Sequence, residues 1–92
     1  MEFEWDARKA AANARKHGIT FGEATTIFAD PLELTISDAD HSHGEYRFLS
    51  IGRTAGGQIV VVSYVEREEN QIRVISARAA TPAEISRYES EP

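Results

Sequence analysis

The stretch RVISARAATPAEISRYE, residues Arg73–Glu89, decides the fold because it joins a strand to the helix that follows it. β-Branched residues after a polar turn predict a strand over Ile72–Arg78. Thr81 is then an N-cap candidate, Pro82 stands at the first helical position, and Glu84 lies three residues after the cap. This capping box predicts a C-terminal helix that begins at Pro82.

Groups that suit phosphodiester chemistry lie close together along this stretch. Arg73 and Arg78 belong to the strand, and Tyr88 follows Glu84 by one turn of the helix. Two guanidiniums, a carboxylate and a phenol can bind a phosphate and move a proton. The same residues also have a structural interpretation, in which Glu84 only caps the helix, Arg73 pairs with Glu66, and Tyr88 packs its ring on the sheet.

Length and composition bound the class of protein. A chain of 92 residues with 41% hydrophobic and 27% charged residues is expected to form one soluble domain with a small core. The absence of cysteine excludes disulfides, thiolate zinc sites and thiol catalysis. No apolar run approaches the ~20 residues of a membrane span, and the charged N-terminus lacks a secretory apolar region, so we expect a cytoplasmic protein.

The net charge of −5 argues against a protein that coats nucleic acid without selectivity, since such proteins are basic. It leaves room for a local basic site. Arginine outnumbers lysine eight to two, and arginine is preferred where a planar fork binds phosphate. The alternative is a solvated surface that happens to use arginine.

The whole chain predicts an α+β fold with two N-terminal helices, an antiparallel β-sheet meander and the C-terminal helix. Asp6 caps the first helix and Gly18 ends it, while Thr20 and Glu23 form a second capping box. The other expected elements are an edge strand at Phe3–Trp5, helices at Ala7–Lys16 and from Thr20 to about Phe28, and strands at Leu32–Ile36, Tyr46–Arg53 and Gln58–Arg67.

Turn lengths predict the register of this meander. A first turn of two residues and a second of four place Ile51 opposite Val60 and Glu66 opposite Arg73. This register divides the strand arginines, with Arg47 and Arg73 on one face and Arg67 and Arg78 on the other.

Two polar segments each carry an alternative function. The first helix has four basic residues, which form either a solvated face or a phosphate contact: Arg8, Lys9, Arg15 and Lys16. The loop Asp38–Glu45 contains His41 and His43 among carboxylates and is either a solvated loop or a metal site.

Four ordered segments resemble BrnT, the toxin of a type II toxin–antitoxin pair. They are residues Phe3–Ala24, Phe28–Pro31, His41–Thr54 and Arg73–Glu89, which together span nearly the whole chain. Ordered segments at consistent separations are more specific than any single motif. The sequence departs from the family pattern at Gln58, where a basic residue is frequent, and at Ala79, where a lysine is frequent.

The resemblance implies more than the residues do by themselves. It implies a RelE-like fold, metal-independent RNA cleavage without a cofactor, and inhibition of translation when the toxin is unopposed. The implied partner is a small BrnA-like antitoxin with a ribbon-helix-helix part, so that DNA is contacted only through the antitoxin. A basic or amphipathic segment of that antitoxin is expected to cover the active site.

The resemblance also implies a set of site residues. Arg67 and Arg78 would bind the scissile phosphate and stabilise its growing charge, and Tyr88 or Glu84 would help to move a proton. Arg47 and Arg73 also match the family pattern, and RNA contacts are expected from them and from Lys16 of the basic first helix. Two alternatives stay open: a non-enzymatic module that only binds a partner protein, and a metal-dependent nuclease built on the histidine loop.

Overall fold

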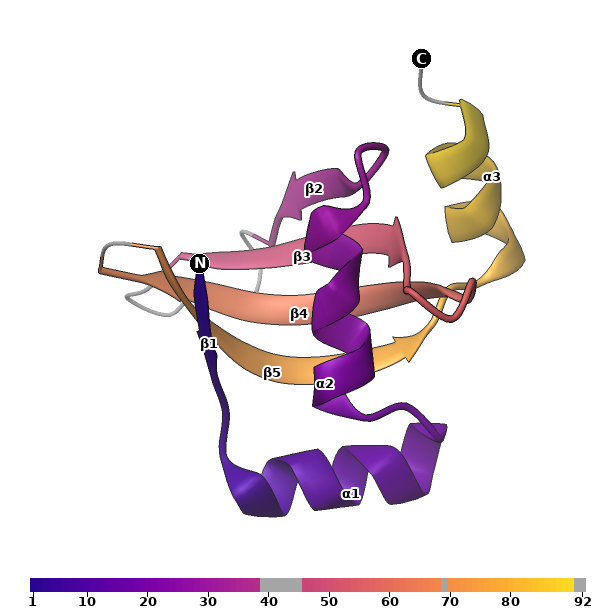
Figure 1. Ribbon diagram of the computed structural model, residues 1–92. Helices are drawn as coiled ribbons and strands as arrows, with labels where there is room; N and C mark the ends of the chain where they lie inside the picture. Colours follow the sequence, from indigo (N-terminus) through magenta and orange to yellow (C-terminus); the bar gives the residue numbers. More distant parts are fainter. Residues whose placement is uncertain (39–45, 69, 91–92) are drawn as a thin grey trace.

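The computed structural model describes residues 1–38, 46–68 and 70–90 and shows one mixed α+β unit (Figure 1). The α+β class and the arrangement of two N-terminal helical segments, a sheet and a C-terminal helix agree with the prediction. The elements are β1 (Glu2–Glu4), α1 (Ala7–His17), α2 (Phe21–Ala24), the 3₁₀ helix η1 (Thr25–Ala29), β2 (Leu34–Ser37), β3 (Arg47–Arg53), β4 (Ile59–Arg67), β5 (Gln71–Ala79) and α3 (Pro82–Ser90).

The strands form one sheet in the order β1-β5-β4-β3-β2. The strands β3, β4 and β5 are sequential antiparallel neighbours, as predicted. The strand β1 lies at the sheet edge as expected, but it runs parallel to β5, so the sheet is mixed rather than antiparallel. The parallel pair is possible because everything between β1 and β5 acts as the crossover connection.

The predicted register of the first hairpin is wrong by one residue. Ile51 lies opposite Val61 instead of Val60. The cause is the turn: Arg53 is the last paired residue of β3 and its partner is Ile59, so residues 54–58 lie in the connection. A shift of one residue turns the side chains of β3 to the other face relative to β4.

The second hairpin is also shifted by one residue near its turn. Glu66 lies opposite Ile72, because Arg67 pairs with Gln71 and the connection holds only residues 68–70. The left-handed backbone of Asn70, with φ of 62°, suits this short connection. Farther along, the register changes between Ser63 and Tyr64. This is a β-bulge with an extra residue in β5, and it returns the rest of β5 to the predicted register.

One face of the sheet carries the larger core, under α1 and the α2–η1 segment (Figure 1). Fully buried aliphatic and aromatic side chains fill this layer: Ile19, Phe21, Ala24 and Ile27 from the helical side, and Val60, Val62, Val74 and Ala77 from the sheet. The opposite face has a smaller buried cluster of Ile51, Val61 and Tyr88, with α3 as its helix.

A buried asparagine fixes α1 to β5. The side chain of Asn13 accepts a hydrogen bond from the Ala77 N–H (3.1 Å) and donates to the Ala77 and Ile19 carbonyls (2.8 and 3.1 Å). Because β1 pairs with β5 only as far as Arg73, the amide of Asn13 takes the place of a neighbouring strand at Ala77.

The helix caps agree with the sequence, with one exception. Asp6 accepts the N–H groups of Arg8 and Lys9, and Gly18 ends α1 in the left-handed conformation with φ of 70°. At the second helix Thr20 accepts the Glu23 N–H. The carboxylate of Glu23 does not return to Thr20 but accepts the Gly56 N–H of the β3–β4 connection, so this is a single cap instead of a capping box.

That carboxylate belongs to a series of three side chains that attach the helical layer to the end of β3 and to the β3–β4 connection. They lie three and four residues apart and accept backbone N–H groups: Glu23 from Gly56 (3.2 Å), Thr26 from Ala55 (2.8 Å) and Asp30 from Arg53 (2.9 Å).

None of the helices in the described ranges is long and apolar enough to cross a membrane.

Candidate functional site

Every arginine of the described strands points to one face of the sheet. The register places Arg47 and Arg73 on either side of Val65, and Arg78 beside Val61. We call this surface the arginine face; its arginines are Arg47 and Arg53 on β3, Arg67 on β4, and Arg73 and Arg78 on β5. The predicted division of these residues between two faces is therefore wrong, because both turns differ in length from the prediction.

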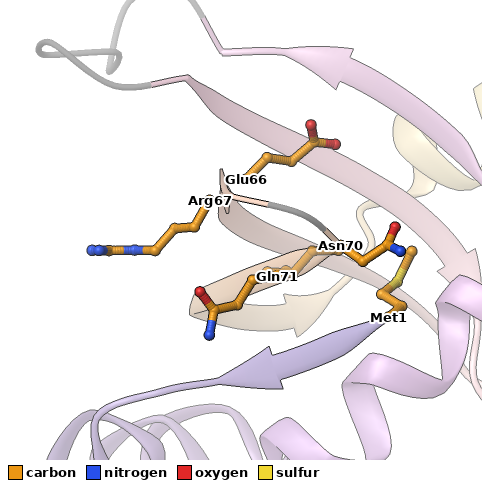
Figure 2. Close-up of a pocket in the computed structure, with 6 residues that line it drawn as sticks. Met1, Glu66, Arg67, Asn70 and Gln71 are labelled. Carbon is orange, nitrogen blue, oxygen red and sulfur yellow. The ribbon is translucent and has the colours of Figure 1, made fainter.

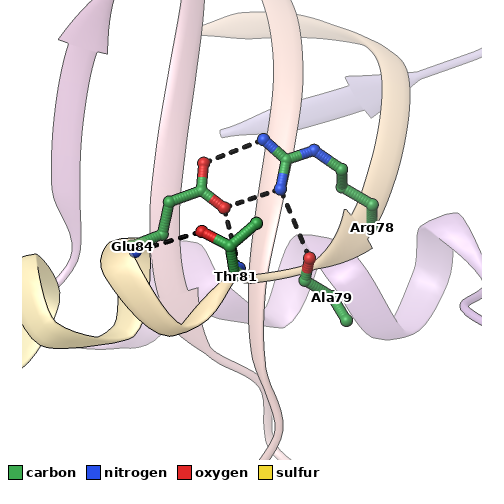
Figure 3. A network of polar contacts seen from close by, with 4 residues as sticks. All are labelled: Arg78, Ala79, Thr81 and Glu84. Carbon is green, nitrogen blue, oxygen red and sulfur yellow. Dashed lines mark hydrogen bonds and ion pairs between the residues drawn. The ribbon is translucent and has the colours of Figure 1, made fainter.

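At one end of the arginine face, which we call the α3 end, Arg78 is bound by Glu84. Two charge-assisted hydrogen bonds join the guanidinium fork to the carboxylate, Nη1 to Oε1 at 2.6 Å and Nη2 to Oε2 at 2.8 Å (Figure 3). Arg78 Nη1 also donates to the Ala79 carbonyl (3.3 Å). This geometry fixes the plane of the guanidinium.

The predicted capping box holds Glu84 in turn. The Thr81 N–H donates to Glu84 Oε1 (2.9 Å), and the Glu84 N–H donates to Thr81 Oγ1 (3.2 Å) (Figure 3). The hydrogen bond from Arg78 is the main cause that lowers the pKa of Glu84 to about 2 against the opposing effect of burial, and the Thr81 N–H adds to it. Glu84 is therefore ionised at neutral pH and raises the pKa of Arg78.

Tyr88 lies at the same end but is buried, with 4% of its surface exposed. Its ring packs with Ile51 and Val61, and its hydroxyl donates a hydrogen bond of 2.6 Å to Asp30 Oδ2. This contact joins α3 to the end of η1, 58 residues earlier in the chain. The alternative in which Tyr88 packs on the sheet describes its environment correctly.

The Asp30 carboxylate accepts hydrogen bonds from three groups. Besides Tyr88, it accepts the backbone N–H groups of Arg53 (2.9 Å) and Leu32 (2.9 Å). Burial opposes its ionisation, but these hydrogen bonds, first that of Tyr88, outweigh burial and lower the pKa of Asp30. The hydrogen bond to Asp30, together with burial, raises the pKa of Tyr88. The Tyr88 hydroxyl therefore stays protonated and directed at Asp30.

The other end of the arginine face, the β4–β5 hairpin end, is more open. Arg67 is exposed and makes no hydrogen bond or ion pair with the described residues. It lines a shallow hollow with Val65, Gln71 and two carboxylates, Glu66 and Glu68, and Figure 2 shows its side chain extending away from Glu66. A guanidinium in this position can bind a phosphate without first leaving a protein partner.

Arg47 and Arg73 lie one row further along the face, on either side of Val65. Their Cα atoms are two strand spacings apart, about 9.5 Å. Arg73 forms an ion pair of 2.8 Å with Glu4 of the neighbouring strand. The predicted pair of Arg73 with Glu66 does not form, since Glu66 lies opposite Ile72.

The predicted site residues thus fall into three places. Arg78, Glu84 and Tyr88 lie together at the α3 end, as expected. Arg67 does not join them: it is six residues along β4 from Val61, the partner of Arg78, which is about 20 Å. Because Arg78 is also held by Glu84, these two arginines do not form one phosphate site.

Lys16 is separate from both ends. It is exposed on α1, which packs with the helical layer against the other face of the sheet. Sequence reasoning also missed Asp30 and Arg53 at the α3 end. In the sequence Asp30 stands out only as part of the Phe28–Pro31 segment of the family resemblance, and no local spacing connects it to Tyr88.

The histidine loop, residues 39–45, lies outside the described residues, so the metal alternative for His41 and His43 stays a prediction. Among residues 1–38, 46–68 and 70–90, no group of three or more histidine, aspartate or glutamate side chains could hold a metal ion.

A helix-covered sheet face opposite a face with aligned arginines defines a small α+β protein that can bind a polyanion. A family model described as the ribonuclease toxin BrnT of a type II toxin–antitoxin system matches residues 5–84. The chain therefore belongs to the BrnT family, and the resemblance found in the sequence is confirmed.

The solved structures agree with this assignment. The Brucella abortus ribonuclease toxin BrnT, known from a crystal structure at 1.1 Å resolution, is similar to this chain with a TM-score of 0.68 and 26% sequence identity. The similarity covers 88% of this chain and 97% of that one. Comparison with curated proteins gave no match.

Proposed function

We propose that this protein is a metal-independent endoribonuclease that cleaves RNA on the arginine face and inhibits translation when it is unopposed. The observation that carries the proposal is the placement of all arginines of the described strands on one sheet face, in a member of a ribonuclease toxin family. RNA suits such a site because its own 2′-hydroxyl is the nucleophile, so the protein has to supply position and charge.

In the proposed reaction the 2′-oxygen bonds to the adjacent phosphorus while the bond to the 5′-oxygen breaks. The products are a 2′,3′-cyclic phosphate and a 5′-hydroxyl, and the proton lost by the 2′-hydroxyl balances the proton gained by the 5′-oxygen. Negative charge grows on the non-bridging oxygens in the transition state. Donors aimed at these oxygens supply the acceleration.

We assign this role to Arg78. Glu84 and Ala79 occupy its Nη1 group and one Nη2 hydrogen, while the Nε–H and the second Nη2–H have no partner among the described residues. These two donors form a second fork that matches two phosphate oxygens. Glu84, already ionised, orients the guanidinium in advance, so little reorganisation is needed during the reaction.

Arg67, Arg47 and Arg73 then bind other phosphates of the same RNA strand. This revises the expectation that Arg67 shares the scissile phosphate with Arg78, since the two lie about 20 Å apart along the strand. Lys16, on the other layer, would make a separate and weaker contact with the RNA.

The second candidate role concerns proton transfer by Tyr88 or Glu84. The geometry favours positioning over proton transfer, because the Tyr88 hydroxyl is bound to Asp30 and the low pKa of Glu84 makes it a weak base. Tyr88→Phe separates the two roles, since loss of a proton-transfer group would cost as much as loss of Arg78.

The test is cleavage of RNA by purified protein, free of any antitoxin, in the presence of chelator, followed by analysis of the new 2′,3′ and 5′ ends. We expect cleavage by the wild type and strong loss in Arg78→Ala, with both proteins folded in a thermal melt. A wild-type protein that binds its partner but cleaves no RNA would instead support the non-enzymatic binding module. Cleavage that chelator abolishes would support a metal-dependent nuclease.

For the partner, we propose a BrnA-like antitoxin whose ribbon-helix-helix part contacts DNA, in a cytoplasmic complex that represses its own operon. A segment of the antitoxin would cover the arginine face, and the charge of that face favours an acidic amphipathic segment over a basic one. Co-purification with the product of the adjacent gene tests this. If the complex blocks cleavage while Arg67 and Arg78 stay accessible to solvent, direct occlusion is wrong.

A further inference from the structure

We infer that Asp30 is a positioning residue for the reaction, which orients Arg78 through α3 without touching the RNA. The inference rests on the proposed cleavage at Arg78. It is drawn from a continuous set of contacts that runs from the helical layer, around the end of β3, to the guanidinium.

The first step is the attachment of α3 to the rest of the protein. Its buried residue is Tyr88, whose ring packs with Ile51 and Val61. The hydroxyl of Tyr88 is bound to Asp30 at 2.6 Å. The Asp30 hydrogen bond thus acts on the one residue of α3 that enters the core.

The second step connects Tyr88 to the reacting group. Glu84 precedes Tyr88 by four residues, so both side chains project from the same side of α3. Tyr88 packs with Val61, and Val61 is the cross-strand neighbour of Arg78. Tyr88 contacts β4 and Glu84 contacts β5, and together these two residues fix the position of α3. The position of α3 in turn determines where Glu84 holds the Arg78 guanidinium.

The third step is the rigidity of Asp30 itself. Its Oδ2 accepts Tyr88 and the Arg53 N–H, and its Oδ1 accepts the Leu32 N–H at 2.9 Å. The space beside it is filled: a Cβ on Gly52 would lie 2.8 Å from Ile27 Cβ and 3.5 Å from Asp30 Oδ2. Asp30 is thus a fixed acceptor that sets the position of α3 through Tyr88.

The chain offers a matched control at Thr26. Its hydroxyl accepts the Ala55 N–H at 2.8 Å, in the same series of contacts to the β3–β4 connection as Asp30. It makes no hydrogen bond to α3 among the described residues. Thr26→Val removes a comparable contact to that connection and leaves the path from Asp30 to Arg78 intact.

The test uses kinetics and a spectroscopic signature on the same variants. Tyr88→Phe removes the hydroxyl that donates to Asp30 and also interacts with the Arg53 side chain, and Asp30→Asn changes the acceptor. We expect both to lower kcat about tenfold with KM within about twofold, since misplacement of a catalytic group costs rate rather than binding. Thr26→Val should stay near wild type in both constants.

A double-mutant cycle then separates positioning from proton transfer and from general stability. In an Arg78→Ala background, Asp30→Asn and Tyr88→Phe should cause no further loss of kcat, because their only route to the reaction is gone. An undiminished loss in that background would overturn the inference.

The spectroscopic signature does not depend on RNA cleavage. In ¹⁵N-labelled protein, the bidentate pair slows rotation of the Arg78 guanidinium and separates its Nη resonances, which Arg78→Lys identifies. We expect Asp30→Asn and Tyr88→Phe to merge these resonances and Thr26→Val to keep them separate. Unchanged Arg78 resonances in both variants would refute the inference even if cleavage is confirmed. Altered resonances in a protein that cleaves no RNA would support the structural link and overturn the proposed function.

Discussion

The two ends of the arginine face hold chemically identical guanidiniums in opposite ways. At the α3 end, Arg78 is paired with Glu84 in two short hydrogen bonds, and Glu84 is itself fixed by Thr81. At the β4–β5 hairpin end, Arg67 is exposed and has no partner among the described residues. An arginine that is oriented in advance suits the stabilisation of a transition state, whereas a free arginine suits the capture of substrate.

The difference shows why a count of arginines is a poor guide to a catalytic site. Pairing with a carboxylate reduces the net charge at the α3 end, which weakens long-range attraction of RNA. It also removes the need to order the guanidinium when the phosphate arrives. At the hairpin end Arg67 has no ion pair with the described residues, although Glu66 and Glu68 line the same hollow, and Arg67 has to be ordered when it binds. Mutations at the two ends should therefore affect different kinetic constants.

The largest effect is expected at the α3 end. Arg78→Ala should lower kcat on the order of 10²-fold with little change in KM, by analogy with the loss of one donor to a developing oxyanion. Single-turnover RNA cleavage in chelator measures this, with Arg15→Ala on α1 as the control. Full activity in a folded Arg78→Ala protein would remove Arg78 from the mechanism and shift the site toward the hairpin end.

The next effect concerns acid stability at the α3 end. The pKa of Glu84 is about 2 in the folded protein against an ordinary value of 4.5. A lowered folded pKa contributes stability that is present above pH ~4.5 and is lost as the pH falls toward ~2. Urea unfolding should therefore show Glu84→Gln to be less stable than wild type at pH 7. The difference between their free energies of unfolding should become smaller below pH ~4.5.

Arg67→Ala provides the contrast, since no carboxylate depends on it among the described residues. Its stability relative to wild type should not change with pH across the same interval. The difference in free energy of unfolding between wild type and Glu84→Gln could instead stay constant from pH 7 to pH 3. That result would show that the ion pair of Arg78 and Glu84 contributes no pH-dependent stability.

A smaller effect on activity is expected at the hairpin end. Arg67→Ala should raise KM several-fold with kcat nearly unchanged. It should also reduce the slope of log binding constant against log salt by ~0.7, the value for one phosphate contact on a single strand. Binding to a non-cleavable RNA analogue at several salt concentrations measures both. If kcat falls as it does in Arg78→Ala, the two ends are not distinct in function.

The smallest effect is expected from Lys16→Ala. Lys16 is exposed on α1, in the layer that covers the opposite face, so we expect KM and the salt slope to stay closer to wild type than in Arg67→Ala. The same binding series measures it. A Lys16 effect equal to that of Arg67 would mean that RNA passes around the β1–β5 side of the sheet.

Much of the fold could be predicted because the deciding signals are local. Thr81, Pro82 and Glu84 lie within four residues of one another, and their capping box forms as expected. Asp6 and Gly18 mark the ends of α1 in the same way. Register was not predictable at this level, because a turn longer or shorter by one residue leaves every strand recognisable and exchanges its faces.

For the candidate site too, contacts between residues close in the sequence could be predicted and contacts between distant residues could not. Arg78, Glu84 and Tyr88 come from one strand–helix segment, so their proximity follows from local geometry. The contacts of Tyr88 with Asp30 and of Arg73 with Glu4 join residues 58 and 69 positions apart. No periodicity in the sequence reports such a pair. The separation of Arg67 from Arg78 is different, because the predicted register already placed Val61 opposite Arg78, six residues along the strand from Arg67.

The sequence by itself determined the elements, their caps, the family resemblance and the cluster at the α3 end, since each depends on residues close together in the chain. Only the tertiary structure decided that all arginines of the described strands share a face and that Asp30 holds the C-terminal helix. Strand pairing and the packing of side chains from distant segments set these features, and both depend on the exact lengths of two turns and one β-bulge.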